Sequence, residues 1–194
     1  VFCGSAESVP PVFIDAARDF GTELGKRGIS LVYGGGDVGT MGVLAKAAMD
    51  AGSRVIGIIP EKLNAMVDHL ELSELIVVAD MHQRKALMQK KAQAFAVLPG
   101  GIGTMEEFFE VWTWRYIGYH SKPVGILNVG GFYNGLLDFL SGMRKQGFVA
   151  ADVLEDLSVE TSGSALIASL ERKLTSPSNI RLKIPERQKR PTRS

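Results

Sequence analysis

The chain has 194 residues, of which 45% are hydrophobic, and its formal net charge at pH 7 is +1. This length suits one globular domain with a sizeable core, and the near-neutral charge argues against a dedicated nucleic-acid surface. The one cysteine, Cys3, excludes an intramolecular disulfide and fits a reducing compartment, so we expect a cytoplasmic protein. We find no signal peptide and no apolar run long enough to span a membrane. Because the first residues already resemble a strand and no initiator Met precedes them, we expect native residues before Val1.

The predicted elements alternate between strands and helices along the chain. In chain order, we predict strands at residues 1–3, 29–33, 54–59, 76–79, 95–98, 123–128 and 157–159. We predict helices at residues 12–27, 43–51, 80–93, 105–119, 132–146 and 163–174, and residues 61–75 are ambiguous between helix and loop. This alternation predicts an α/β class with a single-domain, Rossmann-like fold, in which helices cover both faces of a parallel sheet.

The predicted domain covers residues 1–174, and the remainder has a different composition. Residues 175–194 hold six Lys or Arg residues and one Glu, which gives this segment a net charge of 6 − 1 = +5. Prolines and basic residues without apolar periodicity predict a disordered tail.

Three glycine-containing turns follow predicted strands, at residues 4–5, 34–42 and 99–104. In open parallel sheets, ligands bind beyond the carboxyl ends of the strands, so we expect these turns to converge on one site. The third turn leads into a helix, and its glycines let backbone N–H groups approach a ligand closely. A helix N-terminus with free amides suits a phosphate group.

Thr104 and Glu107 at the start of that helix fit two interpretations. As Thr-x-x-Glu they match a capping box, in which the glutamate only completes the helix start. Alternatively, Glu107 shares a helical face with Val111 and Trp114, so its carboxylate would be partly desolvated and would need a raised pKa or a specific partner. The pattern leaves both interpretations open.

Arg84 is the predicted counter-charge. It falls on the apolar face of its helix, with Met81, Leu87 and Met88 at helical spacing. A buried arginine needs a carboxylate or phosphate partner because burial of an isolated charge is costly. The alternative is a solvated basic helix, since Lys85 and other lysines are nearby.

Other motifs point to other classes of protein. Gly34-x-Gly36-x-x-Gly39 matches the dinucleotide fingerprint, with Glu61 as a possible ribose acid, but an oxidoreductase would leave the second glycine turn without a role. We expect no metal, because the histidines lack ligand spacing: His69, His82 and His120. Cys3 is better explained as a small buried residue than as a nucleophile.

Four stretches together resemble the LOG ("Lonely guy") family: residues 33–42, 81–88, 99–107 and 113–128. The PGGxGTxxE motif at residues 99–107 is complete, and the resemblance covers nearly everything from Val1 to Leu174. It implies a dimeric Rossmann-like hydrolase that cleaves cytokinin riboside 5′-monophosphates into free base and ribose 5-phosphate. It also implies that Arg84 and Glu107 are the catalytic pair and that the phosphate loop consists of Gly100, Gly101, Gly103 and Thr104.

We therefore predict one substrate site without a metal or cofactor. Its residues are Gly4, Ser5, Gly35, Gly36, Met81, Arg84, Lys85, Pro99, Gly100, Gly101, Gly103, Thr104 and Glu107. The helix at residues 105–119 is apolar on more than one face, which predicts a homodimer, and we expect no nucleic-acid or membrane partner. A nucleotide-binding module without hydrolysis is the non-enzyme alternative. The sequence does not decide whether plain or N6-modified adenine is preferred.

Overall fold

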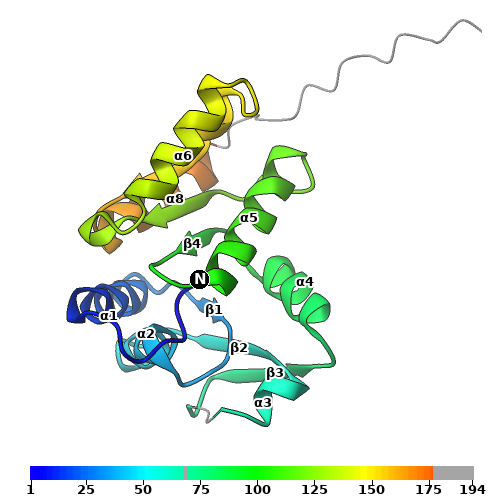
Figure 1. The fold of residues 1–194 in the computed structure, drawn as a ribbon. Coiled ribbons are helices and arrows are strands. Elements are labelled where there is room, and N and C mark those ends of the chain that lie inside the picture. The colour runs from blue at the N-terminus through cyan, green and yellow to red at the C-terminus, as the bar shows by residue number, and fades with distance from the viewer. Residues whose placement is uncertain (68–69, 177–194) are drawn as a thin grey trace, which may run out of the picture.

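The computed structural model describes residues 1–67 and 70–176, and its centre is a layer of parallel strands between helices (Figure 1). β1 (Leu31–Tyr33), β2 (Val55–Pro60) and β3 (Glu74–Val78) pair in the order β1-β2-β3. β4 (Phe95–Val97), β5 (Val124–Leu127) and β6 (Ser158–Glu160) pair in the order β4-β5-β6. Every one of these pairs is parallel, which confirms the predicted α/β class.

The predicted first strand is reduced to one bridging residue, Phe2, which pairs in parallel with β4. Its amide donates to the carbonyl of Ala96 and its carbonyl accepts from the amide of Leu98, both at 2.9 Å. On the other side, the nitrogen of Val1 donates to the carbonyl of Val32 at 2.7 Å. The start of the chain therefore lies between β1 and β4 and joins the two halves of the strand layer.

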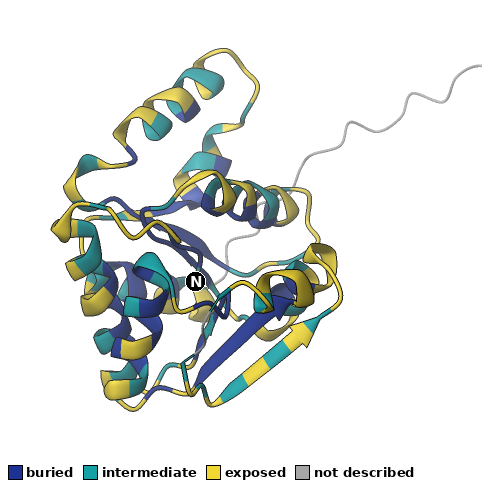
Figure 2. Cartoon of the chain, turned by 60° about the horizontal axis from the view of Figure 1, so that its bottom comes forward, coloured by how far each residue is buried: buried dark blue, intermediate teal, exposed yellow. Residues whose placement is uncertain are grey.

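The helices form two layers, one on each face of the strands. Their bounds are α1 (Pro11–Lys26), α2 (Gly39–Asp50), α3 (Glu61–Asn64), α4 (Met81–Lys91), α5 (Ile102–Tyr116), α6 (Asn134–Lys145), α7 (Ala151–Asp156) and α8 (Gly163–Thr175), with a 3-10 turn, η1, at Val129–Gly131. One core packs α1, α2 and α8 on the strands and includes Phe20 and Leu44. The other packs α4 to α7 and includes Phe108 and Leu140. Figure 2 shows the central strands buried, whereas β3 at the edge alternates between half-buried and exposed residues.

α2 begins at Gly39, four residues before the predicted start at Val43. The Thr40 hydroxyl and the Met41 amide both donate to the carbonyl of Gly4, at 3.0 and 3.2 Å. These bonds fix the first turn of α2 against residues 4–5. They bring the first two of the three glycine turns together, as predicted.

The remaining differences are local. The ambiguous segment 61–75 contains α3 and the start of β3, and α7 was not predicted because six residues are too few to show a helical period. His69 and residues 177–194, which hold most of the predicted tail, lie outside the described residues. Within residues 1–67 and 70–176, no helix has the length and apolar character needed to cross a membrane.

Candidate functional site

A cavity of about 400 Å³ lies at the carboxyl edge of the strands, between the glycine turns and the first turns of α4 and α5. This volume is typical of sites for small molecules. Eight predicted site residues line it: Ser5, Gly36, Met81, Arg84, Gly101, Gly103, Thr104 and Glu107. The other lining residues, which were not predicted for the site, are Cys3, Gly34, Val38, Met41, Ile59, Leu63, Val67, Ile102 and Glu106.

Arg84 from α4 and Glu107 from α5 meet in the wall of this cavity. The residues are only 8% and 7% exposed, and Arg84 Nη1 lies 2.9 Å from Glu107 Oε1. The contact is one of charge rather than an aligned hydrogen bond, because Glu107 Oε1 accepts no hydrogen bond from the described residues. Arg84 is held separately, since its Nε donates to the carbonyl of Ile58 at 3.1 Å. The prediction of a buried arginine with a carboxylate partner is confirmed, and the solvated-helix alternative is wrong for Arg84.

Gly34 makes room for the Arg84 side chain. A Cβ at Gly34 would lie 2.4 Å from Arg84 Nη2, which is closer than any real Cβ contact. The first glycine of the dinucleotide-like pattern therefore accommodates a guanidinium group of the chain itself. Glu61, the possible ribose acid, is exposed at the start of α3.

The surroundings of Glu107 shift its proton affinity. Burial raises the pKa of its carboxyl, and the charge of Glu106 adds to the rise. The positive charges of Arg84 and Lys85 oppose it, but the net pKa is raised. Both outcomes expected of a desolvated carboxylate, a raised pKa and a specific partner, are present. Such groups are concentrated at functional sites.

The capping-box interpretation of the α5 start is wrong. The helix begins at Ile102 with Gly101 as the N-cap residue, and the amide of Met105 donates to the carbonyl of Gly101 at 3.1 Å. Thr104 therefore lies inside the first turn and does not cap it. Its hydroxyl packs beside Gly100, where a Cβ would lie 2.1 Å from Thr104 Oγ1.

Five predicted site residues are not among those that line the cavity: Gly4, Gly35, Lys85, Pro99 and Gly100. The first and third turns bond to each other behind it, where the amide of Gly4 donates to the carbonyl of Pro99 at 3.3 Å. Gly35 has a φ of 84° and packs against the β2 backbone, which explains the need for glycine there. The amino group of Lys85 pairs with two glutamates of α5 instead of facing the cavity.

Other reactive side chains do not support different chemistry. No three His, Cys, Asp or Glu side chains among the described residues are grouped to hold a metal ion. Cys3 lines the cavity, but burial raises the pKa of its thiol to about 12, which disfavours the nucleophilic thiolate. His120 is a loop residue: its Nε2 lies 2.9 Å from the carbonyl of Val111, and its Nδ1 accepts from the amide of Lys122 at 3.2 Å.

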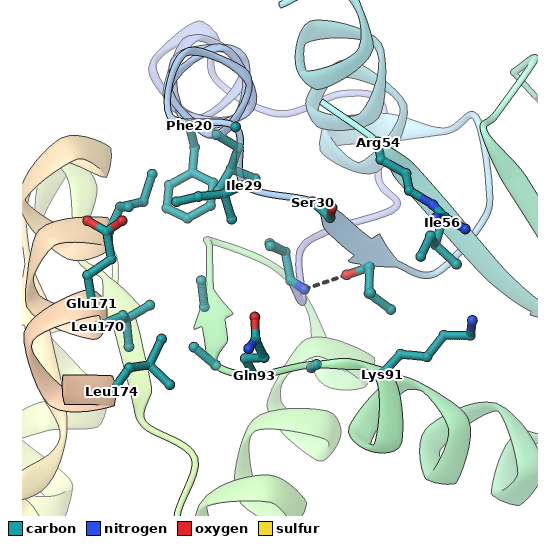
Figure 3. Close-up of a pocket in the computed structure, with 18 residues that line it drawn as sticks. Phe20, Ile29, Ser30, Arg54, Ile56, Lys91, Gln93, Leu170, Glu171 and Leu174 are labelled. Atoms are coloured by element: carbon teal, nitrogen blue, oxygen red, sulfur yellow. Dashed lines mark hydrogen bonds between the residues drawn. The ribbon is translucent and has the colours of Figure 1, made fainter. Parts of the chain in front are cut away.

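A larger cavity, of about 660 Å³, lies at the opposite edge of the strand layer, beside α1 and α8 (Figure 3). Its charged side chains are already paired: Arg54 and Lys91 with Glu74, and Glu171 with Arg27. The amino ends of parallel strands are not where ligands of such sheets bind. The smaller cavity, with its buried charge pair, is therefore the candidate active site.

Comparisons with known proteins show which proteins the chain resembles. A family model described as "Possible lysine decarboxylase" matches residues 41–170. The chain is 46% identical over 172 residues to cytokinin riboside 5′-monophosphate phosphoribohydrolase LOG3 of Arabidopsis thaliana, covering 88% of this chain and 80% of that protein. It is 44% identical over 173 residues to the probable cytokinin riboside 5′-monophosphate phosphoribohydrolase LOGL1 of Oryza sativa subsp. japonica, covering 89% and 78%. A molybdenum cofactor binding protein from Rippkaea orientalis has a similar structure, with a TM-score of 0.67, 22% identity and coverage of 88% and 93%. The last likeness is one of fold alone.

Proposed function

The chain belongs to the LOG family of cytokinin riboside 5′-monophosphate phosphoribohydrolases, and we propose that it hydrolyses the N-glycosidic bond of adenosine 5′-monophosphates, including N6-modified ones. The products are the free base and ribose 5-phosphate. The observation that carries this proposal is the buried contact between Arg84 and Glu107 in the wall of the cavity, beside the first turn of α5.

Cleavage of the glycosidic bond sends its electron pair to the base nitrogen and leaves oxocarbenium character on the ribose. The ionised Glu107 stabilises that positive charge and orients the attacking water. The water oxygen bonds to the anomeric carbon, and one water proton goes to the departing base. The two-carboxylate scheme of most glycosidases does not apply, because the other carboxylate lining the cavity, Glu106, is exposed and paired with Lys85. Arg84 holds Glu107 from the side of β2, where Ile58 anchors the guanidinium.

The 5′-phosphate is assigned to the N-terminus of α5, next to Gly101, Gly103 and Thr104. Glycine backbones at positions 101 and 103 face open space, because a Cβ at either position would meet no atom within 4 Å. Unpaired amides and the helix dipole both favour an anion there. The base is assigned to the apolar wall that includes Ile59, Leu63 and Val67.

The assembly is proposed to be a homodimer that forms around α5. At the C-terminal end of this helix, large apolar side chains are exposed in the single chain: Trp114, Ile117 and Tyr119. A second copy would cover them. Light scattering should give twice the 21.0 kDa of one chain, and a monomer at micromolar concentration would contradict the proposal. We also propose that the protein acts in the cytoplasm, in keeping with its one cysteine.

A decarboxylase that uses a lysine-linked cofactor is not supported. No lysine is among the described residues that line the cavity, and Lys85 is turned toward α5. A module that binds nucleotide without hydrolysis would not need a carboxylate with a raised pKa buried beside the ligand.

The test is incubation with isopentenyladenosine 5′-monophosphate, with AMP and with the unphosphorylated riboside, followed by chromatography. We expect equal amounts of free base and ribose 5-phosphate from the monophosphates, and much less base from the riboside because it lacks the anion that α5 binds. Nucleotide binding by calorimetry without base release would identify a binding module. A nicotinamide absorbance change would identify an oxidoreductase.

A further inference from the structure

A row of long polar side chains connects α4 to α5 next to the Arg84–Glu107 contact. Lys85 Nζ lies 2.5 Å from Glu106 Oε1 and 3.1 Å from Glu110 Oε1. One helical turn further along α4, the side chain of Gln89 donates to Glu110 Oε2 at 3.4 Å. Lys85 and Gln89 are four residues apart on α4, as Glu106 and Glu110 are on α5. Residues at this spacing lie on one face of a helix, so each pair faces the other helix.

Lys85 is more enclosed than its charge alone would suggest. Its side chain is 13% exposed, and the hydrogen bonds that its amino group donates to Glu106 and Glu110 raise the pKa of that group, so it stays charged. Glu110 is 22% exposed and Glu106 is 51% exposed, so salt screens the contact with Glu110 less than the contact with Glu106. Lys85 thus makes an inter-helix contact, although the sequence predicts it among the residues of the substrate site.

The position of Glu107 depends on where α5 lies. Its Oε1 accepts no hydrogen bond from the described residues, so no aligned donor fixes that oxygen. Glu106 and Glu110, the two partners of Lys85, stand on either side of it in the sequence of α5. Lys85 itself follows Arg84 on α4. The lysine contacts therefore bridge the two helices beside the residues that bring Arg84 and Glu107 together.

We infer that Lys85 is a positioning residue for the hydrolysis, which holds α5 through Glu106 and Glu110 so that Glu107 meets both Arg84 and the substrate. This inference rests on the proposed hydrolase function. Small displacements of a reacting group are costly in rate, about 10²-fold for 1 Å.

The charges of Lys85 and Glu106 should also change how the rate of hydrolysis depends on pH. The titratable side chains that interact with Glu107 belong to Cys3, Arg84, Lys85 and Glu106. Among them, the Lys85 charge lowers the pKa of Glu107 and the Glu106 charge raises it. Glu107 acts as the ionised carboxylate, so activity is lost as the pH falls through its pKa. Removal of the Lys85 charge should move this acid limb to higher pH, and removal of the Glu106 charge should move it to lower pH.

The experiment compares Lys85→Met, Lys85→Arg and Glu106→Gln with wild type, using Lys90→Met, an exposed lysine of the same helix, as the matched control. Lys85→Met should lower kcat by about tenfold or more. Its acid limb of kcat/KM should move upward, while that of Glu106→Gln moves downward. Lys85→Arg should restore most of kcat, and Lys90→Met should match wild type in both measurements.

A second measurement does not need turnover. Carbon-13 NMR of labelled glutamate carboxyls follows the titration of Glu107, whose signal is assigned by its loss in Glu107→Gln. The midpoint of this titration should move to higher pH in Lys85→Met and to lower pH in Glu106→Gln. If wild type releases no base, the proposed function fails while this titration still decides what Lys85 does. A folded Lys85→Met protein with wild-type kcat and an unmoved Glu107 titration overturns the inference. If Lys85→Met does not fold, an unmoved titration in Glu106→Gln overturns it equally.

Discussion

Replacing Glu107 by glutamine removes one charge from the candidate site and keeps the volume of the side chain. If the carboxylate stabilises a developing ribosyl cation, kcat should fall by roughly 10²-fold or more, the scale of general acid–base or electrostatic catalysis. This factor corresponds to about 3 kcal/mol of transition-state stabilisation. A purely structural role for this side chain would instead predict no loss of activity.

Although its kcat should fall, the Glu107→Gln variant should keep or gain stability. Burial raises the pKa of Glu107 even with Arg84 against it, so folding stabilises the uncharged carboxyl more than the carboxylate. For a pKa raised on folding, the favourable contribution is complete at pH values below the unfolded pKa and is lost as the pH rises through the folded pKa. Glutamine resembles the protonated form at every pH. The variant should therefore be as stable as wild type near pH 7 or more stable, by roughly 1 kcal/mol for each pKa unit of the rise.

The assay pairs turnover with thermal unfolding. Base release from isopentenyladenosine 5′-monophosphate measures kcat, and circular dichroism at about pH 5 and about pH 8 measures the melting temperature. The advantage of the glutamine variant in melting temperature should grow with pH. A folded variant with wild-type turnover would give Glu107 a structural role only. A marked loss of stability at the higher pH would refute the electrostatic argument.

Three further changes can be tested, two at this pair and one at the C-terminal tail. Arg84→Ala should lower kcat by roughly 10²-fold in the same assay, because it leaves the carboxylate without its counter-charge. Gly34→Ala should displace the guanidinium and lower kcat by about tenfold, because its Cβ would lie 2.4 Å from Arg84 Nη2. The matched control is Gly135→Ala in α6, where a Cβ meets nothing within 4 Å; it should keep wild-type kcat and melt slightly higher. A chain that ends at Ser176 should keep the melting temperature and turnover of the full chain, and a large loss of either would show that the tail contributes to the domain.

The layered fold and the position of the site could be predicted because their signals are local. Strand-like runs that end in glycine turns identify the carboxyl edge, and helical spacing places Arg84 on an apolar face. The α5 start could not be predicted in the same way. Thr-x-x-Glu is the same pattern whether Thr104 caps the helix or lies inside its first turn. Only the bond from the Met105 amide to Gly101 shows which applies.

Contacts between segments that are far apart in the sequence could not be predicted from the spacing of residue types. Lys85 follows Arg84 directly, yet successive residues on a helix point about 100° apart, so the two side chains reach different partners on α5. Tyr133 supports the end of β4, because its hydroxyl donates to the carbonyl of Leu98 at 2.7 Å. The cavity wall formed by Leu63 and Val67 comes from the segment with the weakest periodicity. Each of these depends on how elements pack, which the sequence expresses only through the whole fold.

The two buried arginine–carboxylate contacts of α5 show why one is structural and the other is suited to catalysis. Near the C-terminal end of the helix, Arg115 donates from two nitrogens to Asp156 and from a third to the carbonyls of Ser121 and Lys122. A buried ion pair is tolerated when aligned hydrogen bonds satisfy it in this way, and this one ties α5 to α7 and to the loop before β5. Near the other end, Glu107 has the charge contact with Arg84 but no aligned donor at Oε1. The Arg84 contact holds one oxygen of the carboxylate, and Glu107 itself lines the cavity, where a water or a developing cation can approach the side chain. The well-satisfied pair thus anchors the helix that holds the Glu107 carboxylate at the cavity.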